Sequence, residues 1–223
     1  MKKLLIISLL LLISTTFFVL NAQKLSIETG YSNPVRYGSN FSSTYLNGNQ
    51  LGLIANQDLK YNFGLLTGFT YTIAYGGNNQ LYPSATVNYY HMALFADVPL
   101  QIIYSLPVSD SFKFFTFAGP KLNIGLLQKQ IINSNYAGVP SADRYLYSSN
   151  ILKNLNYQLG IGGGMQWNQF ILKGGYDYGL NNLNKLNTGN LYQNSWYLTF
   201  AYEFASLGLF TKSVKSETKV ISK

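Results

Sequence analysis

Hydrophobic and polar residues alternate along most of this chain with a period of two, the pattern of a β-strand whose two faces differ. The longest example runs from Tyr90 to Tyr104, where every second residue is apolar and Asp97 lies among the polar positions. After a short polar segment the alternation resumes from Phe112 to Leu126, with Lys121 on the polar face. Strands in globular sheets have about 5–6 residues. The two segments therefore predict an unusually long antiparallel hairpin.

Six further segments alternate in the same way and bring the number of predicted strands to eight. They cover residues 25–31, 51–61, 63–75, 155–167, 170–178 and 196–204. Strands one, three, five and seven are followed by long polar loops, whereas the other connections are shorter; the loops cover residues 33–47, 76–86, 128–150 and 181–192. This asymmetry is typical of outer-membrane proteins. We predict an all-β fold, an eight-stranded antiparallel up-and-down transmembrane β-barrel in the outer membrane of a Gram-negative bacterium, with both termini periplasmic.

The positions of the aromatic residues decide which face meets lipid. Aromatics stand at the ends of the apolar stripes, for example Tyr90 and Tyr104, where the two membrane interfaces favour them. A soluble barrel with the faces exchanged is the alternative. The polar face is rich in glycine and carries few charges, of both signs, which suits a narrow lumen. We expect a structural polar network inside the barrel, formed by Glu28, Asp58, Lys60, Asp97, Lys113, Lys121, Lys173, Asp177 and Glu203.

Hairpin geometry predicts neighbours within this network. If residues 168 and 169 form a two-residue turn, the facing pairs are Trp167 with Phe170, Gly164 with Lys173, and Gly160 with Asp177. An in-register turn in the long hairpin places Asp97 opposite residue 119 or 121, so we expect Asp97 and Lys121 to pair in the lumen. Proline lacks a ladder donor, so Pro99 and Pro120 predict bulges or bends.

Composition and the N-terminus agree with a membrane protein. Charged residues make up 11% of the chain, against roughly 25% in typical soluble domains. Lys2 and Lys3 precede an apolar run from Leu4 to Leu20, and Ala22 offers a small residue for cleavage. An uncleaved anchor is the alternative. We expect a signal peptide at residues 1–22, the barrel at 23–205 and a periplasmic basic tail at 206–223.

The charge balance and the rare residues exclude several classes of function. The net charge of +8 comes mainly from the two ends, and ten Lys or Arg face seven Asp or Glu between Lys24 and Ala205. That small excess, without a basic-aromatic motif, excludes a nucleic-acid surface. The chain has no cysteine and a single histidine, His91. We therefore predict no thiolate or multi-histidine metal site and no cofactor.

Two neighbouring motifs carry a resemblance to a known family. The run from Ala93 to Tyr104 contains Val98-Pro99-Leu100-Gln101-Ile102-Ile103-Tyr104, and the next strand carries Gly119-Pro120. This stretch resembles the PorT-like outer-membrane β-barrels of Bacteroidota, in which a strand ending in a proline-leucine-tyrosine pattern precedes a strand with Gly-Pro. The resemblance implies a barrel fold and brings no catalytic residue.

The candidate sites for chemistry are few. His91 shares a face with Asp97, but six residues separate them, about 20 Å along a strand; a Ser–His pair with Ser84, as in a lipid-modifying enzyme, is the enzymatic alternative. Residues 160–164 resemble a nucleotide loop but lie inside a strand with no helix after them, so their glycines are expected to give room in the lumen. We predict no catalytic residue.

The functional hypothesis is a non-enzymatic protein, structural or accessory to a surface or secretion assembly. An eight-stranded barrel is only wide enough for its own side chains, and the alternative is a narrow, porin-like channel. Expected partners are membrane lipid and proteins that contact the outer loops, above all residues 133–147, or the basic tail.

Overall fold

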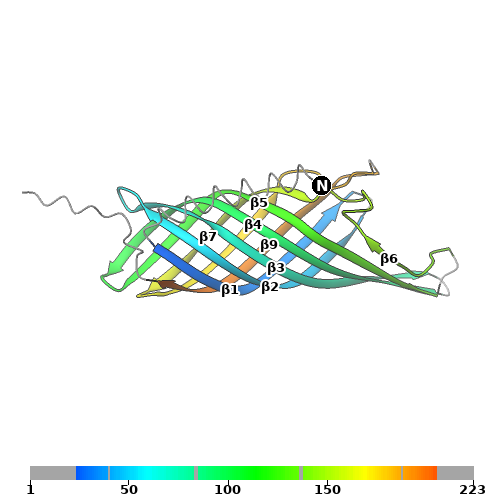
Figure 1. The fold of residues 1–223 in the computed structure, drawn as a ribbon, viewed down its shortest axis with the longest axis horizontal. Helices are drawn as coiled ribbons and strands as arrows, with labels where there is room; N and C mark the ends of the chain where they lie inside the picture. Colours follow the sequence, from blue (N-terminus) through cyan, green and yellow to red (C-terminus); the bar gives the residue numbers. More distant parts are fainter. Residues whose placement is uncertain (1–23, 40, 83–84, 136–137, 187, 205–223) are drawn as a thin grey trace, which may run out of the picture.

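The fold is a closed barrel of antiparallel strands (Figure 1). The computed structural model describes residues 24–39, 41–82, 85–135, 138–186 and 188–204; the predicted signal peptide and basic tail lie outside them. The strands are β1 (Lys24–Gly38), β2 (Phe41–Asp58), β3 (Phe63–Tyr82), β4 (Ala85–Ser109), β5 (Phe112–Ser134), β6 (Ala142–Tyr145), β7 (Leu155–Trp167), β8 (Phe170–Gly179) and β9 (Leu191–Phe204).

Eight of these strands form the ring, which confirms the predicted fold class. The order is β4-β3-β2-β1-β9-β8-β7-β5, and pairing of β4 with β5 closes the barrel. The ninth strand, β6, was not expected from the sequence; it pairs with the outer part of β5 and lies outside the ring. Closure leaves the ring without an edge strand, which satisfies the backbone hydrogen bonds in a lipid environment.

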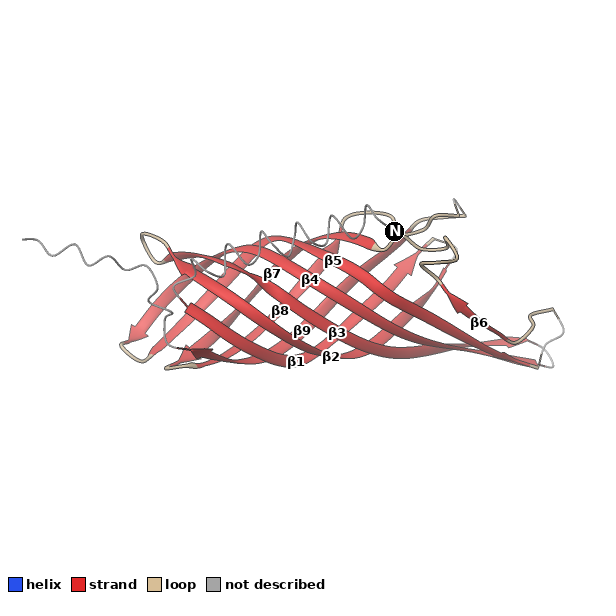
Figure 2. Cartoon of the chain, viewed as in Figure 1, coloured by secondary structure: helices blue, strands red, loops and turns tan. Residues whose placement is uncertain are grey.

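The strands extend well beyond the predicted limits, so the predicted loops at residues 33–47 and 76–86 are wrong. Both segments form the arms of hairpins, with Gly38 paired to Phe41 and Tyr82 paired to Ala85. Their Asn, Ser and Gly residues resemble a loop in composition, but the backbone hydrogen bonds of a neighbouring strand hold them extended. At one end of the barrel, called here the loop end, β3, β4, β5 and β6 project furthest (Figure 2).

The opposite end, called here the turn end, has short connections. The two-residue turn at Asn168 and Gln169 is confirmed, with Trp167 paired to Phe170 and Asn168 at a φ of 51°. The connection between β4 and β5 is shorter than expected because β4 continues to Ser109. Of the bulges or bends predicted at Pro99 and Pro120, the bulges are wrong: the register shifts of this hairpin lie between Leu94 and Phe95 and between Pro107 and Ser109.

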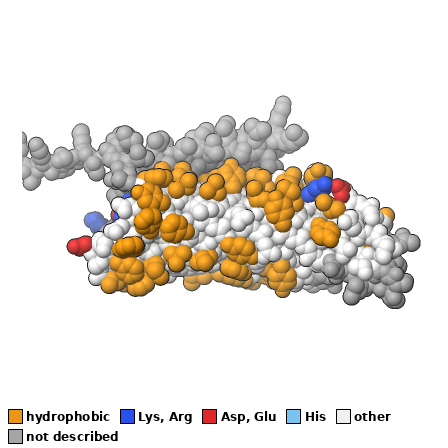
Figure 3. Space-filling model, turned by 90° about the horizontal axis from the view of Figure 1, so that it is seen from below, with side chains coloured by type: hydrophobic (Ala, Val, Ile, Leu, Met, Phe, Trp, Pro, Cys, Tyr) orange, Lys and Arg blue, Asp and Glu red, His pale blue; other side chains and the backbone are white. Residues whose placement is uncertain are grey.

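The outer surface is apolar along most of its length. Large hydrophobic side chains on alternate positions of every ring strand are exposed, among them Ile161 at 62% and Leu198 at 52%. Figure 3 shows hydrophobic side chains over the visible face, with acidic and basic groups only toward the two ends. Among the described residues, no helix has the length and hydropathy needed to cross a membrane.

Candidate functional site

The lumen is packed by side chains that alternate with the apolar outer residues. Near the turn end, Phe115 and Phe117 of β5 point inward and are buried. Glycines of β7 give them room, because a Cβ on Gly162 would lie 2.3 Å from Cζ of Phe117 and one on Gly164 would lie 2.6 Å from Cζ of Phe115. The glycine run in β7 therefore makes space for bulky lumenal side chains, as its position in a strand predicted.

The middle of the lumen holds one lysine between two aspartates. Lys121 Nζ lies 2.7 Å from Oδ2 of Asp177 and 3.6 Å from Oδ2 of Asp97. Asp97 also accepts a hydrogen bond of 2.7 Å from Asn123 Nδ2, and the Tyr197 ring lies under the ammonium group at 5.3 Å. The pair expected between Asp97 and Lys121 is present, although its register differs from the prediction, since Asn123 stands opposite Asp97.

A second ion pair lies closer to the turn end. Lys173 Nζ lies 2.7 Å from Oε2 of Glu28, and Gln50 Nε2 donates to Oε1 of the same carboxylate at 3.0 Å. Glu28 is 2% exposed and Lys173 is 7% exposed. Charges buried to this degree persist only when they are paired and hydrogen-bonded. The two clusters together place two lysines and three carboxylates in the middle of the lumen.

The four remaining residues of the predicted network lie near the turn end. Lys113 and Glu203 are half-buried at the mouth. Asp58 is exposed and pairs with Lys24 at 2.9 Å, and Lys60 is exposed in the turn that follows β2. The prediction that Asp58 and Lys60 lie inside the lumen is wrong for these positions, because Asp58 is the exposed last residue of β2 and Lys60 follows it outside the strand.

A cap of loop residues closes the loop end of the lumen. Leu146, Leu152, Leu183 and Leu191 form a buried apolar cluster, with Tyr147 and Ile151 packed against it. The Tyr147 hydroxyl accepts a hydrogen bond of 3.4 Å from Arg36 Nη2, and Arg36 Nε donates to Gln193 at 2.8 Å. Burial raises the pKa of the Tyr147 hydroxyl, an effect that the Arg36 guanidinium opposes. The hydrogen bond between Arg36 and Tyr147 thus joins the cap to the lumen.

Sequence reasoning missed Arg36 and the role of Tyr147. Arg36 fell in a segment assigned to a loop, although the inward alternation of Ser26, Glu28 and Ser32 continues through it. Tyr147 was singled out only as an outer-loop residue. Its phenol enters the lumen beside Gly125, where a Cβ would lie 2.1 Å from the Tyr147 hydroxyl oxygen. The inward position of Gly125 is the one feature of the sequence that could have indicated space for this ring.

Among the described residues, His91 is a buried packing residue of the lumen. His91 is 8% exposed, and its Nδ1 lies 3.4 Å from Gln128 Nε2. Ser84, the serine considered as its partner, lies outside the described residues. Within the described ranges, no group of three or more His, Cys, Asp or Glu side chains could hold a metal ion.

The free volume inside the barrel is small and divided. A cavity of about 20 Å³ lies between the two ion-pair clusters, lined by Glu28, Gln101 and Lys121 among others. A second cavity, of about 30 Å³, lies closer to the turn end. A larger pocket of about 220 Å³ opens at the turn end itself, beside Lys113. The inner cavities have room for single water molecules. Several buried polar atoms that face the lumen have no hydrogen-bond partner among the residues that the structure describes, including Gln158 Oε1 and Asp177 Oδ1.

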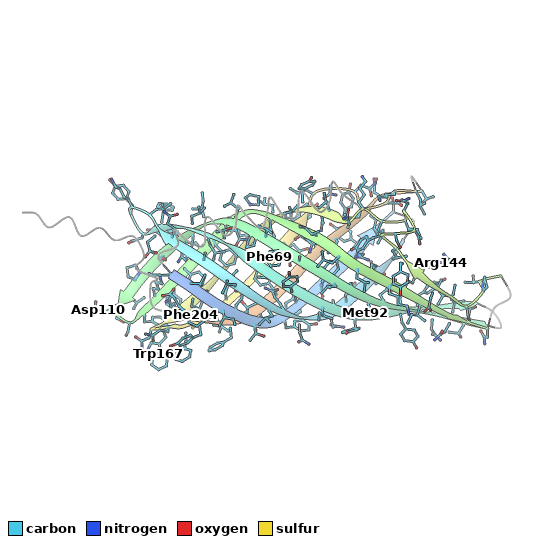
Figure 4. All side chains as sticks on the ribbon, viewed as in Figure 1. Phe69, Met92, Asp110, Arg144, Trp167 and Phe204 are labelled. Atoms are coloured by element: carbon cyan, nitrogen blue, oxygen red, sulfur yellow. The ribbon has the colours of Figure 1, made fainter. Side chains whose placement is uncertain are left out.

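A closed antiparallel barrel with an apolar exterior, aromatic rims and a charge-filled lumen defines a transmembrane β-barrel protein. The aromatic rim at the turn end includes Trp167 and Phe204, which project outward in Figure 4. The chain belongs to the outer membrane protein beta-barrel domain family, whose model matches residues 20–185. It is therefore an outer-membrane β-barrel protein.

Several solved structures are similar to this chain over most of its length. The attachment invasion locus protein Ail of Yersinia pestis is 14% identical, with 82% of this chain and 99% of that chain covered and a TM-score of 0.39. Neisserial surface protein A is 16% identical, with coverages of 81% and 96% and a TM-score of 0.39. The outer membrane enzyme PagL is 16% identical, with coverages of 78% and 98% and a TM-score of 0.39. No curated protein sequence matches the chain.

Proposed function

We propose that this chain is a non-enzymatic outer-membrane protein that serves as a structural or accessory part of a surface or secretion assembly. The proposal includes the domain organisation above, with a signal peptide at residues 1–22, a barrel at 23–205, and a basic tail at 206–223 in the periplasm beside the N-terminus. The loop end then faces the outside of the cell.

The observation that carries the proposal is the closed lumen. The two ion-pair clusters fill the middle, and the cap around Leu146 and Tyr147 covers the loop end. A solute would have to displace paired charges that cost several kcal/mol to separate from their partners. A surface role is favoured because the parts that project, β6 and the outer ends of β3, β4 and β5, lie outside the barrel proper.

Site-specific photo-crosslinking in intact outer membranes tests the assembly role. A photoreactive residue at Arg144, which is exposed at the loop end, is expected to give discrete protein adducts. The same residue at Ile161, on the lipid-facing wall, should give none and serves as the matched control. Absence of any protein adduct from Arg144 and from positions in the basic tail would remove the support for a partner.

The rival functions have their own measurements. A narrow, porin-like channel is the alternative, and the purified barrel in planar bilayers is expected to show no conductance above the lipid background. Discrete conductance steps would favour the channel. Comparison of outer-membrane lipids from cells with and without the protein, and with His91→Ala, tests the enzymatic alternative; a lipid product lost in both cases would contradict the non-enzymatic proposal.

A further inference from the structure

On one side of the barrel the outer face becomes polar well before the loop end. Asn47 and Asn49 are exposed on the outer face of β2, and Asn33 and Asn194 occupy outward-facing positions of β1 and β9, where neighbouring groups cover them to 8% exposure. Asn33 Nδ2 donates to the carbonyl of Leu46 at 2.7 Å, and Asn194 Nδ2 donates to the Tyr176 hydroxyl at 2.7 Å. Tyr31 and Trp196 stand just below them with ring centroids 5.1 Å apart. Amides above an aromatic pair mark the end of a lipid-facing belt.

Asn47 and Asn49 of β2 each belong to a row of paired residues that runs across β3, β4 and β5. On that other side of the barrel the rows consist mainly of apolar residues. Asn49 pairs with Ile73, which pairs with Leu94, which pairs with Leu127. Asn47 leads in the same way to Tyr75, Met92 and Lys129. Ile73 is 45% exposed, and Tyr75 and Met92 are likewise exposed. The first charged residue in these two rows is Lys129, whose ammonium group pairs with Asp143 at 2.7 Å.

The rows of paired residues are inclined to the barrel axis. This slope increases the difference in height between the polar side and the apolar side of the outer face. A row that leaves β7 at Met165 passes through β8, β9, β1, β2, β3, β4 and β5 in turn and returns to β7 at Leu155, nearer the loop end. Each step from β1 toward β5 therefore rises toward the loop end. Met92 stands higher than Asn47 in the same row, and Figure 4 places it beyond Phe69 in the direction of Arg144.

We propose that the lipid-facing belt of this barrel is slanted, so that membrane lipid covers Ile73, Tyr75, Met92 and Leu126 on β3, β4 and β5 but stops below the asparagines of β1, β2 and β9. The barrel axis is then inclined to the membrane normal, and the projecting β3–β4 hairpin leans over the lipid surface. The occupant is lipid because this apolar area is continuous with the belt around the barrel.

An inclined barrel keeps the aliphatic residues of β3, β4 and β5 in lipid and the asparagines of β1, β2 and β9 outside the hydrocarbon. An upright barrel would either expose these aliphatic side chains to water, at about 25 cal/mol for each Å² of apolar surface, or draw the asparagine amides into hydrocarbon. The tyrosines that stand beyond the asparagines, Tyr37, Tyr45 and Tyr192, are residues that the membrane interface favours. An inclined barrel keeps Lys129 at the headgroup level, where a lysine can reach water.

Spin labels on single cysteines test the slant in lipid nanodiscs that hold one barrel each. The chain has no cysteine, so each label reports one site. Met92→Cys and Ile73→Cys are compared with Asn47→Cys and Asn49→Cys, with Ile161→Cys as the mid-belt reference and Leu186→Cys as the aqueous reference. Collision rates are measured with oxygen, which concentrates in lipid, and with a water-soluble nickel chelate.

The labels at 92 and 73 are expected to match the mid-belt reference, with an oxygen-to-nickel ratio several-fold above that of the labels at 47 and 49. Water-like values at 92 and 73 would overturn the proposal. Low rates with both reagents would also overturn it, since protein and not lipid would then cover the patch. A heat-dependent shift on gel electrophoresis checks folding, and Tyr75→Cys replaces any variant that fails this check.

Discussion

Lys121 and Asp177 form a salt bridge of 2.7 Å between β5 and β8, two strands that are not neighbours in the ring. The bridge from Lys173 to Glu28 likewise joins β8 to β1 across β9. Ladder hydrogen bonds connect only adjacent strands, so these contacts brace the barrel across its lumen. The charges that appeared in the sequence as sparse polar positions thus have a mechanical role.

Replacement of Lys121 by Met should strongly destabilise the barrel. The change leaves Asp97 and Asp177 buried beside each other without their cation, and loss of one partner of a buried ion pair costs about 3–5 kcal/mol. The free energy of unfolding in urea, measured in lipid vesicles, is expected to fall by that amount.

The exposed lysine at Lys153 provides the matched control, since Lys153→Met should change the free energy of unfolding by less than about 0.5 kcal/mol. The triple variant with Asp97→Asn and Asp177→Asn added to Lys121→Met should recover part of the loss, because it removes the uncompensated charges. A Lys121→Met barrel as stable as wild type would show that the cluster does not brace the lumen.

Substitution of Gly160 by Ala should destabilise the barrel by crowding the same cluster. A Cβ at this position would lie 2.6 Å from both Asp177 Oδ1 and Gln101 Nε2, and overpacking of this kind costs about 1–3 kcal/mol. Gly174→Ala on β8 is the control, because its nearest neighbour lies at 3.5 Å and the two changes restrict the unfolded chain equally. Equal unfolding free energies for both variants would contradict the assigned crowding.

The ring of eight strands could be predicted from the sequence because the patterns that indicate it are local. Alternation along Tyr90–Tyr104 and the turn at Asn168 are properties of adjacent residues, and closure of the ring follows once eight amphipathic strands must hide their edges. The facing of Gly164 with Lys173 and of Gly160 with Asp177 followed from the turn alone and is confirmed.

The ends of the strands and the cap depended on contacts between distant segments. Residues 33–47 were assigned to a loop on composition, yet pairing with neighbouring strands holds residues 33–38 in β1 and 41–47 in β2 extended. Arg36 donates a hydrogen bond to Tyr147, which is 111 residues away in the sequence. No local sequence pattern predicts a contact between residues so far apart. The register of the long hairpin differs from expectation because β4 continues to Ser109 and the turn lies at residues 110 and 111, which brings Asn123 and not Lys121 opposite Asp97.

Introduction of a charge into the cap should open the loop end locally. Leu146 is 6% exposed, and loss of its burial removes about 1.5–3 kcal/mol of apolar stabilisation. Leu146→Asp is expected to accelerate tryptic cleavage after Arg144 and Lys153 by roughly tenfold to a hundredfold. Leu186→Asp, at a side chain that is 53% exposed, should leave both cleavage rates unchanged. An unchanged rate in Leu146→Asp would mean that the cap is not a cooperative unit.

The lipid-facing assignment predicts that an exposed residue is intolerant of charge. Ile161 is 62% exposed and stands on the outer face near the middle of β7, so Ile161→Arg should cost about 2–4 kcal/mol if hydrocarbon surrounds it. Leu106→Arg, at a side chain that is 51% exposed near the turn end, should cost about 0–1 kcal/mol because the guanidinium reaches the interface. In a water-exposed barrel both changes would fall within about 0.5 kcal/mol. Urea unfolding of the two variants in the same vesicles separates these outcomes, and equal small values would contradict a lipid-facing β7.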